Sequence, residues 1–297
     1  MNLIPPRKLC LSGGGIRAVA FVGALEVLHK KKLLANIKEY IGVSAGALIG
    51  FLLAIGYTLQ ELKKLVLEFD FGLIRNLEPE NTLSFLEHYG LDNGANLERL
   101  FESVTKQKGI PASITFQELK ELRPNFPEFR CYATDLQTCK EREFSLAKSP
   151  TVKIVDALRA SMCLPFYFTP TEDPITGHLL GDGGLMNNYP MVFLNEEEQR
   201  HSLGLMFSGE HAENKSIDHF YDFLLQMFAC IYMPRIRSIT ANLSDRTILL
   251  PLGDFPAWNF EATKEERYTL IQAAAEATEA FLTRGNKKLP FRRYSVA

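Results

Sequence analysis

Residues 37–57 read IKEYIGVSAGALIGFLLAIGY, and this stretch decides the fold. Ile37–Val43 is predicted to be a strand and the apolar run from Ala45 a helix, so a sharp turn must join them. From residue 41 to 57 the chain carries no charge, but this run falls short of the roughly 20 residues that span a bilayer. Its four glycines and other small residues favour a helix buried on all sides inside a globular core.

The rest of the chain alternates in the same way between apolar runs of strand length and helical patterns. Lys8–Ser12 is predicted to be a strand, Gly13–Gly15 a turn and Ile16–Lys32 a helix with a basic C-terminal end. Further strands are predicted at 129–134, 143–146, 166–169, 178–180, 203–207 and 247–252, and further helices at 151–161, 216–239 and 264–284. This alternation indicates an α/β fold with a mainly parallel central sheet between helices.

We expect a single domain over residues 1–297, because no Pro/Gly/Ser-rich linker interrupts the pattern. The segment 58–125 is polar and helical, with breaks at proline and glycine, and is interpreted as an insertion on the sheet. The motifs that carry chemistry fall within 8–195. Residues 211–297 are expected to supply helices and a strand that complete or cap the core.

The composition is that of an ordinary globular protein. Of 297 residues, 46% are hydrophobic and 23% are charged, which excludes collagen-like, coiled-coil and disordered chains. Lysine and arginine number 33 against 35 acidic residues, so the net charge is −2 and no basic field favours nucleic acid as a partner. The five cysteines include no CxxC pair and the N-terminus has no secretory-signal pattern, which together favour a reducing, cytoplasmic location.

The turn in the opening stretch, Gly42-Val43-Ser44-Ala45-Gly46, matches the pattern G-x-S-x-G. A serine on such a strand-to-helix turn projects its hydroxyl from the sheet, and glycines flank it because side chains there would meet neighbouring backbone. The start of the helix adds partial positive charge near a developing oxyanion. Ser44 is therefore a candidate nucleophile. The alternative is a small-residue turn that only packs a helix on a strand.

A second glycine cluster, Ser12-Gly13-Gly14-Gly15-Ile16-Arg17, also lies between a predicted strand and a predicted helix. Successive glycines at a helix start expose backbone N–H groups, and Arg17 adds a cation one turn later, so the loop is a candidate site for an oxyanion or a phosphate. Gly13, Gly15 and Ala18 also match the dinucleotide pattern G-x-G-x-x-A. The acidic residue expected at the end of the second strand is missing, which disfavours nucleotide binding.

A serine nucleophile needs a base, and two kinds are present. A Ser-His-Asp esterase would use a late histidine, for which His201, His211 and His219 are candidates, although each has polar or charged neighbours. The stronger candidate is Asp182 in Gly181-Asp182-Gly183-Gly184, where the glycines permit a close backbone approach. The alternative for this motif is an Asp-Gly turn. Asp135, at the end of a predicted strand, is interpreted as a turn or cap residue.

Together these blocks resemble the patatin-like phospholipase family, over about residues 8–195. The matching blocks, in order, are Gly13–Arg17, the turn around Ser44, the central strand Ala133-Thr134-Asp135-Leu136, Ala160-Ser161 to Pro165-Phe166, and Asp182-Gly183-Gly184. Ala18 departs from the family, whose loop often carries glycine there. A methyl group is tolerable at that position if it is already helical.

The resemblance implies a three-layer sandwich and an acyl hydrolase with a Ser44–Asp182 dyad in place of a triad. The backbone N–H groups of Gly13, Gly14 and Gly15 would form the oxyanion hole, and Arg17 would either stabilise that loop or contact a lipid phosphate. Gly42, Gly46, Gly183 and Gly184 would shape the turns that carry the dyad. Such a mechanism requires no cofactor and no metal.

The expected partner is a lipid substrate at a membrane surface, contacted transiently by a cytoplasmic protein. The predicted helix 216–239 carries an apolar stripe, interpreted either as core or as an acyl-chain channel or membrane flap. Two alternatives stay open: a Ser-His-Asp esterase that uses a late histidine, and a non-catalytic nucleotide- or lipid-binding module that keeps the glycine loops for anion binding.

Overall fold

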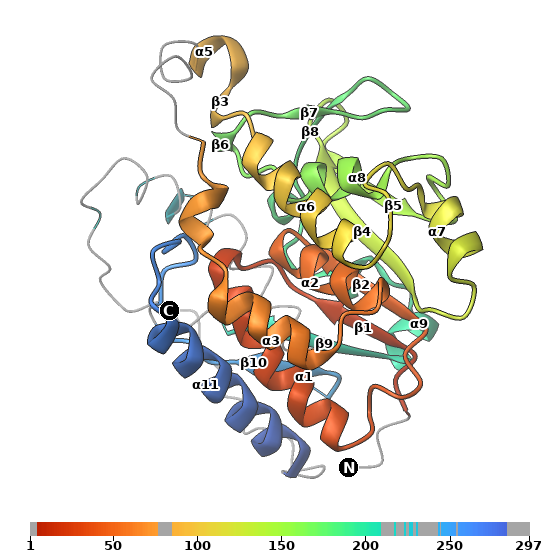
Figure 1. Ribbon diagram of the computed structural model, residues 1–297, viewed down its shortest axis with the longest axis vertical. Coiled ribbons are helices and arrows are strands. Elements are labelled where there is room, and N and C mark those ends of the chain that lie inside the picture. Colours follow the sequence, from red (N-terminus) through yellow and green to blue (C-terminus); the bar gives the residue numbers. More distant parts are fainter. Residues whose placement is uncertain are drawn as a thin grey trace, which may run out of the picture.

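The computed structural model describes residues 5–76, 85–208, 245–253 and 255–283, together with the single positions 217, 223, 226, 227, 230 and 243. Within these residues, helices pack around one large, mostly parallel sheet (Figure 1). The architecture is the α/β sandwich that the sequence predicts.

The large sheet has the strand order β10-β9-β1-β2-β4-β8-β7, with β5 also paired to β4. Strands β10, β9, β1, β2 and β4 run parallel, whereas β5 and β8 run antiparallel to β4, and β7 runs antiparallel to β8. The strands are β1 (Lys8–Leu11), β2 (Glu39–Val43), β4 (Glu128–Asp135), β5 (Lys140–Ser145), β7 (Thr171–Glu172), β8 (Leu179–Asp182), β9 (Ser202–Phe207) and β10 (Thr247–Leu250).

The central strands are buried on both faces because covering elements lie on each side. Successive side chains alternate between the faces, so Leu9 and Leu11 join the larger core while Cys10 joins a smaller one with Tyr189 and Met191. The helices of the larger core include α1 (Phe21–Lys30), α2 (Ala45–Ala54), α8 (Ile154–Ser161) and α11 (Lys264–Thr283). The smaller core lies under the short helices η4 (Pro190–Phe193) and α9 (Glu196–Arg200).

The segment 58–125 forms the predominantly helical insertion that its sequence pattern predicts. Its elements are α3 (Leu59–Glu68), η2 (Phe71–Ile74), α5 (Phe85–His88), β3 (Gly90–Asp92), α6 (Ala95–Gln107) and α7 (Phe116–Leu122). Capping boxes start both α3, at Thr58 and Glu61, and α7, at Thr115 and Glu118. In Figure 1, α3 lies beside α1, and α6 lies beside α8. The insertion therefore packs against helices of the larger core.

Two elements differ from the prediction. The predicted helix Ile16–Lys32 begins as a 3₁₀ helix, η1 (Gly15–Ala20), and only then continues as α1. Gly15, the first residue of η1, has a left-handed φ of 56°, which glycine adopts without strain. The strand β6 (Phe166–Phe168) pairs with β3 in a separate two-stranded sheet. The predicted helix 216–239 lies outside the described residues apart from single positions.

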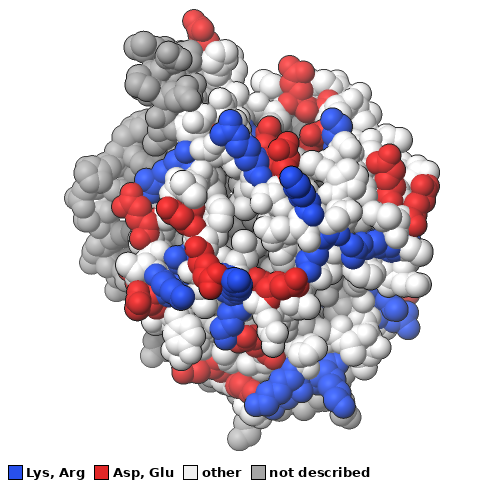
Figure 2. Space-filling model, viewed as in Figure 1, with Lys and Arg blue, Asp and Glu red and all other residues white. Residues whose placement is uncertain are grey.

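The surface and the longest apolar run agree with the sequence analysis. Lysine and arginine side chains are interspersed with acidic ones on the face shown in Figure 2, so no field of one sign dominates it. The apolar run after Ser44 forms α2, a helix of 10 residues whose side chains are nearly all buried. Across the described part of the chain, no helix combines the length and apolarity needed to cross a membrane.

Candidate active site

Ser44 and Asp182 meet because β2 and β8 pair with neighbouring stretches of the same strand, β4. Val43 pairs with Tyr132, and Asp182 pairs with the next residue, Ala133. Ser44, which follows Val43, therefore arrives beside Asp182. The Ser44 hydroxyl donates a hydrogen bond of 2.7 Å to Asp182 Oδ2, and both residues are buried.

The backbone of Ser44 is held in an unfavourable conformation. Its φ of 52° and ψ of −130° lie outside the regions that non-glycine residues ordinarily occupy, which costs about 1–3 kcal/mol. The Ser44 N–H donates to Ser161 Oγ at 3.0 Å, and the Ser161 hydroxyl donates to the Tyr132 carbonyl at 2.7 Å. Ser161 thereby ties the strained turn to β4.

Gly42 and Gly46 are required by close backbone contacts at this turn. A Cβ atom on Gly42 would lie 2.4 Å from the backbone of Ala47, and one on Gly46 would lie 2.4 Å from the Ser12 carbonyl oxygen. Both distances are shorter than real Cβ contacts, so any side chain would push α2 away from the strands. The G-x-S-x-G pattern therefore has the structural cause that the sequence analysis predicts.

Asp182 sits in an environment that suits a general base. Its Oδ1 accepts a 2.7 Å hydrogen bond from the Gly184 N–H, which leaves Oδ2 facing the Ser44 hydroxyl. Burial raises the pKa of the Asp182 carboxyl to about 6, although the hydrogen bonds from Ser44 and Gly184 oppose this rise. A Cβ atom on Gly183 would lie 2.3 Å from the Tyr132 carbonyl oxygen, so this glycine permits the close approach to β4.

The glycine loop at 13–15 lies beside Ser44, but its three N–H groups are not equivalent. A Cβ atom on Gly13 would lie 3.1 Å from Ser44 Cβ. The Gly13 N–H already donates to the Asn188 carbonyl at 3.0 Å, and Asn188 Nδ2 donates back to the Gly13 carbonyl at 2.9 Å. The Gly13 N–H, expected as an oxyanion donor, is thus already engaged with Asn188 in this structure. The N–H groups of Gly14 and Gly15 donate to no other described residue.

Arg17 points to the C-terminal part of the chain. Its Nε donates to the Phe255 carbonyl at 2.6 Å, and the neighbouring Ile16 N–H donates to the Ala257 carbonyl at 2.8 Å. Ala18 lies within η1 and is buried, so the methyl group that departs from the usual glycine is accommodated in a helical position.

No described histidine contacts the Ser44–Asp182 pair. His201 immediately precedes β9, whose parallel pairing places it at the edge of the sheet opposite to Ser44. His211 and His219 lie outside the described residues. Asp135 accepts hydrogen bonds from the N–H groups of Gln137 and Thr138, which confirms its interpretation as a turn residue. Among the described residues, no group of His, Cys, Asp or Glu side chains is arranged to hold a metal ion.

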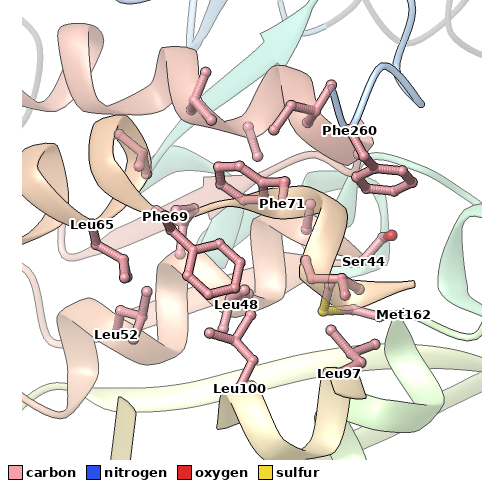
Figure 3. Close-up of a pocket in the computed structure, with 18 of the residues that line it drawn as sticks. Ser44, Leu48, Leu52, Leu65, Phe69, Phe71, Leu97, Leu100, Met162 and Phe260 are labelled. Atoms are coloured by element: carbon pink, nitrogen blue, oxygen red, sulfur yellow. The ribbon is translucent and has the colours of Figure 1, made fainter. Parts of the chain in front are cut away.

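An apolar pocket opens beside Ser44 and encloses about 840 Å³, part of it open to solvent. Ser44 is its one hydroxyl-bearing side chain among the described residues, and no charged side chain lines it. Figure 3 shows Ser44 near Phe260 and Met162 at one end and Leu52 and Leu65 at the other. The pocket is lined mainly from η1, α2, α3, η2 and α6, together with Trp258 and Phe260.

Sequence reasoning missed most of this pocket, as well as two polar residues of the site. The insertion 58–125 carries no functional motif, yet its apolar side chains form much of the pocket wall. Ser161 lies within a matching block, but nothing in the pattern indicates that its hydroxyl accepts a hydrogen bond from the Ser44 backbone. Asn188 carried no signal, because its hydrogen bonds to Gly13 depend on the tertiary fold.

The buried serine–carboxylate pair on an α/β sheet, next to an apolar pocket, has the chemical character of a lipid hydrolase. The family model for patatin-like phospholipase matches residues 9–194. The chain therefore belongs to the patatin-like phospholipase family, as the sequence motifs predicted.

Proteins similar to this chain include two relatives by sequence and one solved structure with a similar fold. YqhO of Bacillus subtilis (strain 168) is 28% identical over 290 residues, covering 91% of this chain and 96% of YqhO. A probable lipid hydrolase, 463L of Invertebrate iridescent virus 6, is 33% identical over 185 residues, covering 62% of each chain. VipD from Legionella pneumophila has a similar fold, with a TM-score of 0.60 and 17% identity, covering 94% of this chain and 67% of VipD.

Proposed function

We propose that this lipid hydrolase cleaves fatty-acyl esters of glycerophospholipids or lysophospholipids with a Ser44–Asp182 dyad. The observation that carries the proposal is the 2.7 Å hydrogen bond from Ser44 to Asp182 at one end of the apolar pocket. A hydroxyl paired with a buried base is activated as a nucleophile, and an apolar cavity beside it suits an acyl chain. We place the reaction in the cytoplasm, at a membrane surface that the enzyme contacts peripherally.

The reaction would proceed through an acyl-enzyme. Ser44 Oγ attacks the ester carbonyl carbon while its proton passes to Asp182 Oδ2. The tetrahedral intermediate breaks its bond to the alkoxy group, which leaves as the alcohol after it receives that proton. Water then attacks the acyl-enzyme and gives a proton to Asp182. The Ser44–acyl bond breaks, Ser44 regains its proton, and the fatty acid is released.

The oxyanion of each tetrahedral intermediate would be stabilised by backbone groups. The N–H groups of Gly14 and Gly15 are the available donors on the loop that borders Ser44. The N-terminus of α2, which starts directly after Ser44, adds partial positive charge. Gly13 would instead hold the loop in place through its two hydrogen bonds with Asn188.

The pocket's geometry sets the acyl chain length that it can hold. Ser44, Leu48 and Leu52 line it in succession along α2, and eight residues of helix rise about 12 Å. An extended alkyl chain advances about 1.25 Å per carbon, given bonds of roughly 1.5 Å at an angle near 111°. About ten carbons would therefore lie beside α2 between Ser44 and Leu52.

The function is tested by fatty-acid release across phospholipids, lysophospholipids and neutral esters with acyl chains of two to eighteen carbons. We expect kcat/KM to rise with chain length up to about ten carbons, because each buried methylene contributes about 0.8 kcal/mol, and then to level off. An alkyl fluorophosphonate should label Ser44, as identified by peptide mass spectrometry. Absence of both labelling and release would instead favour a non-catalytic binding module.

The activity should fall in acid with an apparent pKa of about 6. The active form has an ionised Asp182, and burial raises the pKa of that carboxyl to about 6, so activity is present above this pH and lost below it. We expect kcat/KM to drop about tenfold per pH unit on the acid side. A pH profile on a short-chain ester, with folding followed by circular dichroism, measures this. Full activity at pH 4.5 would contradict a buried carboxylate base.

A further inference from the structure

A segment far from the family motifs in sequence forms part of the pocket wall. Residues 255–262, here called the C-terminal strap, lie beyond the 9–194 match. Trp258 and Phe260 of the strap line the apolar pocket together with Ser44. Figure 3 shows Phe260 at the same end of the pocket as Ser44. The strap is therefore in position to contact the part of an acyl chain nearest the reacting ester.

The strap is attached to the end of the glycine loop and the start of η1 through three consecutive residues, 15–17. The Ile16 N–H donates to the Ala257 carbonyl at 2.8 Å, and Arg17 Nε donates to the Phe255 carbonyl at 2.6 Å. Gly15 packs so tightly on the strap that a Cβ atom would lie 2.1 Å from the Ala257 oxygen. The same loop carries the Gly14 and Gly15 N–H groups that we propose as oxyanion donors.

A second attachment joins the strap to the insertion. Arg75 Nη1 lies 3.1 Å from Glu261 Oε1, and the Arg75 guanidinium lies 5.6 Å from the centre of the Phe260 ring. This ion pair is exposed on the glutamate side, so it contributes less than the partly buried Arg17 bond, whose donor is charged. Arg17 is therefore the main side-chain attachment that the structure shows for the strap.

We propose that Arg17 is a positioning residue that fastens the C-terminal strap onto the glycine loop and thereby completes the acyl-chain wall. The proposal rests on the proposed esterase function and deepens it. Two roles are expected for Arg17, stabilising the loop or contacting a lipid phosphate, and this proposal favours the first. Loss of the bond would loosen Trp258 and Phe260 on one side and the Gly14 and Gly15 donors on the other.

The test compares two substrates with the same acyl chains, a diacyl phospholipid and the corresponding uncharged diacylglycerol. We expect Arg17→Met to lower kcat/KM about tenfold on both, because the lost bond has a charged donor. Arg17→Lys keeps the charge but places a carbon where arginine has Nε, so it should lose nearly as much. Arg99→Met, on the exposed surface of α6, serves as the control and should leave both rates unchanged.

A double-mutant cycle links Arg17 to the wall. If Arg17 acts through the strap, the double variant Arg17→Met/Trp258→Ala should have a kcat/KM only slightly below that of Arg17→Met alone. Independent roles would instead make the two losses in kcat/KM additive on a free-energy scale. A loss confined to the phospholipid, or full phospholipid activity in Arg17→Lys, would overturn the proposal and identify Arg17 as a phosphate contact. If the wild type hydrolyses neither ester, the proposed function fails instead.

Discussion

Ser44→Ala and Asp182→Asn should each lower fatty-acid release about 1,000-fold or more, because residues that act as one nucleophilic unit lose most of their effect when either is removed. Both substitutions conserve shape, and in Asp182→Asn the amide oxygen would still accept the 2.7 Å hydrogen bond from the Gly184 N–H. The fold should therefore persist, with a circular dichroism spectrum and melting temperature close to wild type. The rates are measured on purified variants with the best substrate of the lipid panel.

Asp135→Asn is a matched control for Asp182→Asn. Asp135 is also a buried carboxylate, and it pairs with Leu180 of β8, but it contacts His178 and the turn after β4 rather than Ser44. We expect this variant to keep wild-type activity. Equal losses in Asp135→Asn and Asp182→Asn would mean that damage to the sheet, rather than loss of the base, explains the effect.

The same assay separates the dyad from the triad. A Ser-His-Asp esterase would lose activity when one of His201, His211 or His219 is replaced by glutamine. The dyad predicts that all three variants stay active. Near-complete retention of activity in Asp182→Asn, together with loss in a histidine variant, would reject the dyad.

The pairing of Ser44 with Asp182 could be predicted from sequence because backbone packing restricts the residues beside them. Gly42, Gly46 and Gly183 each face a neighbouring backbone atom at a distance that no Cβ permits, so the glycines mark the turns at which strands and helices approach most closely. Such a requirement is local and leaves a readable pattern. The strands β1, β2 and β9 were predictable for a related reason, since their burial favours mostly apolar runs.

The pocket could not be predicted in this way. Leu65, Leu97 and Leu100 occupy ordinary positions on amphipathic helices, and a leucine that lines a cavity has the same sequence pattern as one that fills a core. The hydrogen bond between the Gly13 N–H and Asn188 joins residues far apart in the chain, so no spacing reveals it. For the same reason the strap's place beside Ser44 becomes visible only in three dimensions.

Replacing glycine by alanine should have opposite effects on stability at two positions of α2, Gly46 and Gly50. At Gly46 a Cβ atom would lie 2.4 Å from the Ser12 carbonyl oxygen and 2.5 Å from that of Leu11. Leu11 is the last residue of β1, and Ser12 follows it. At Gly50, one turn further on, the nearest atom is Tyr40 Cβ at 3.5 Å, an ordinary contact. The two positions share a helix and differ in the space available.

Gly46→Ala should therefore lower the free energy of unfolding by roughly 1–3 kcal/mol or more, because helix and strand must move apart. Activity should fall further than stability explains, since the moving groups carry Ser44 and the glycine loop. Gly50→Ala should raise the free energy of unfolding by about 0.4–1 kcal/mol, because alanine restricts the unfolded chain and favours the helix. Urea titration measures both. Equal destabilisation by the two substitutions would show that α2 does not rest on β1 at Gly46, and the position of Ser44 at the start of α2 would then need another cause.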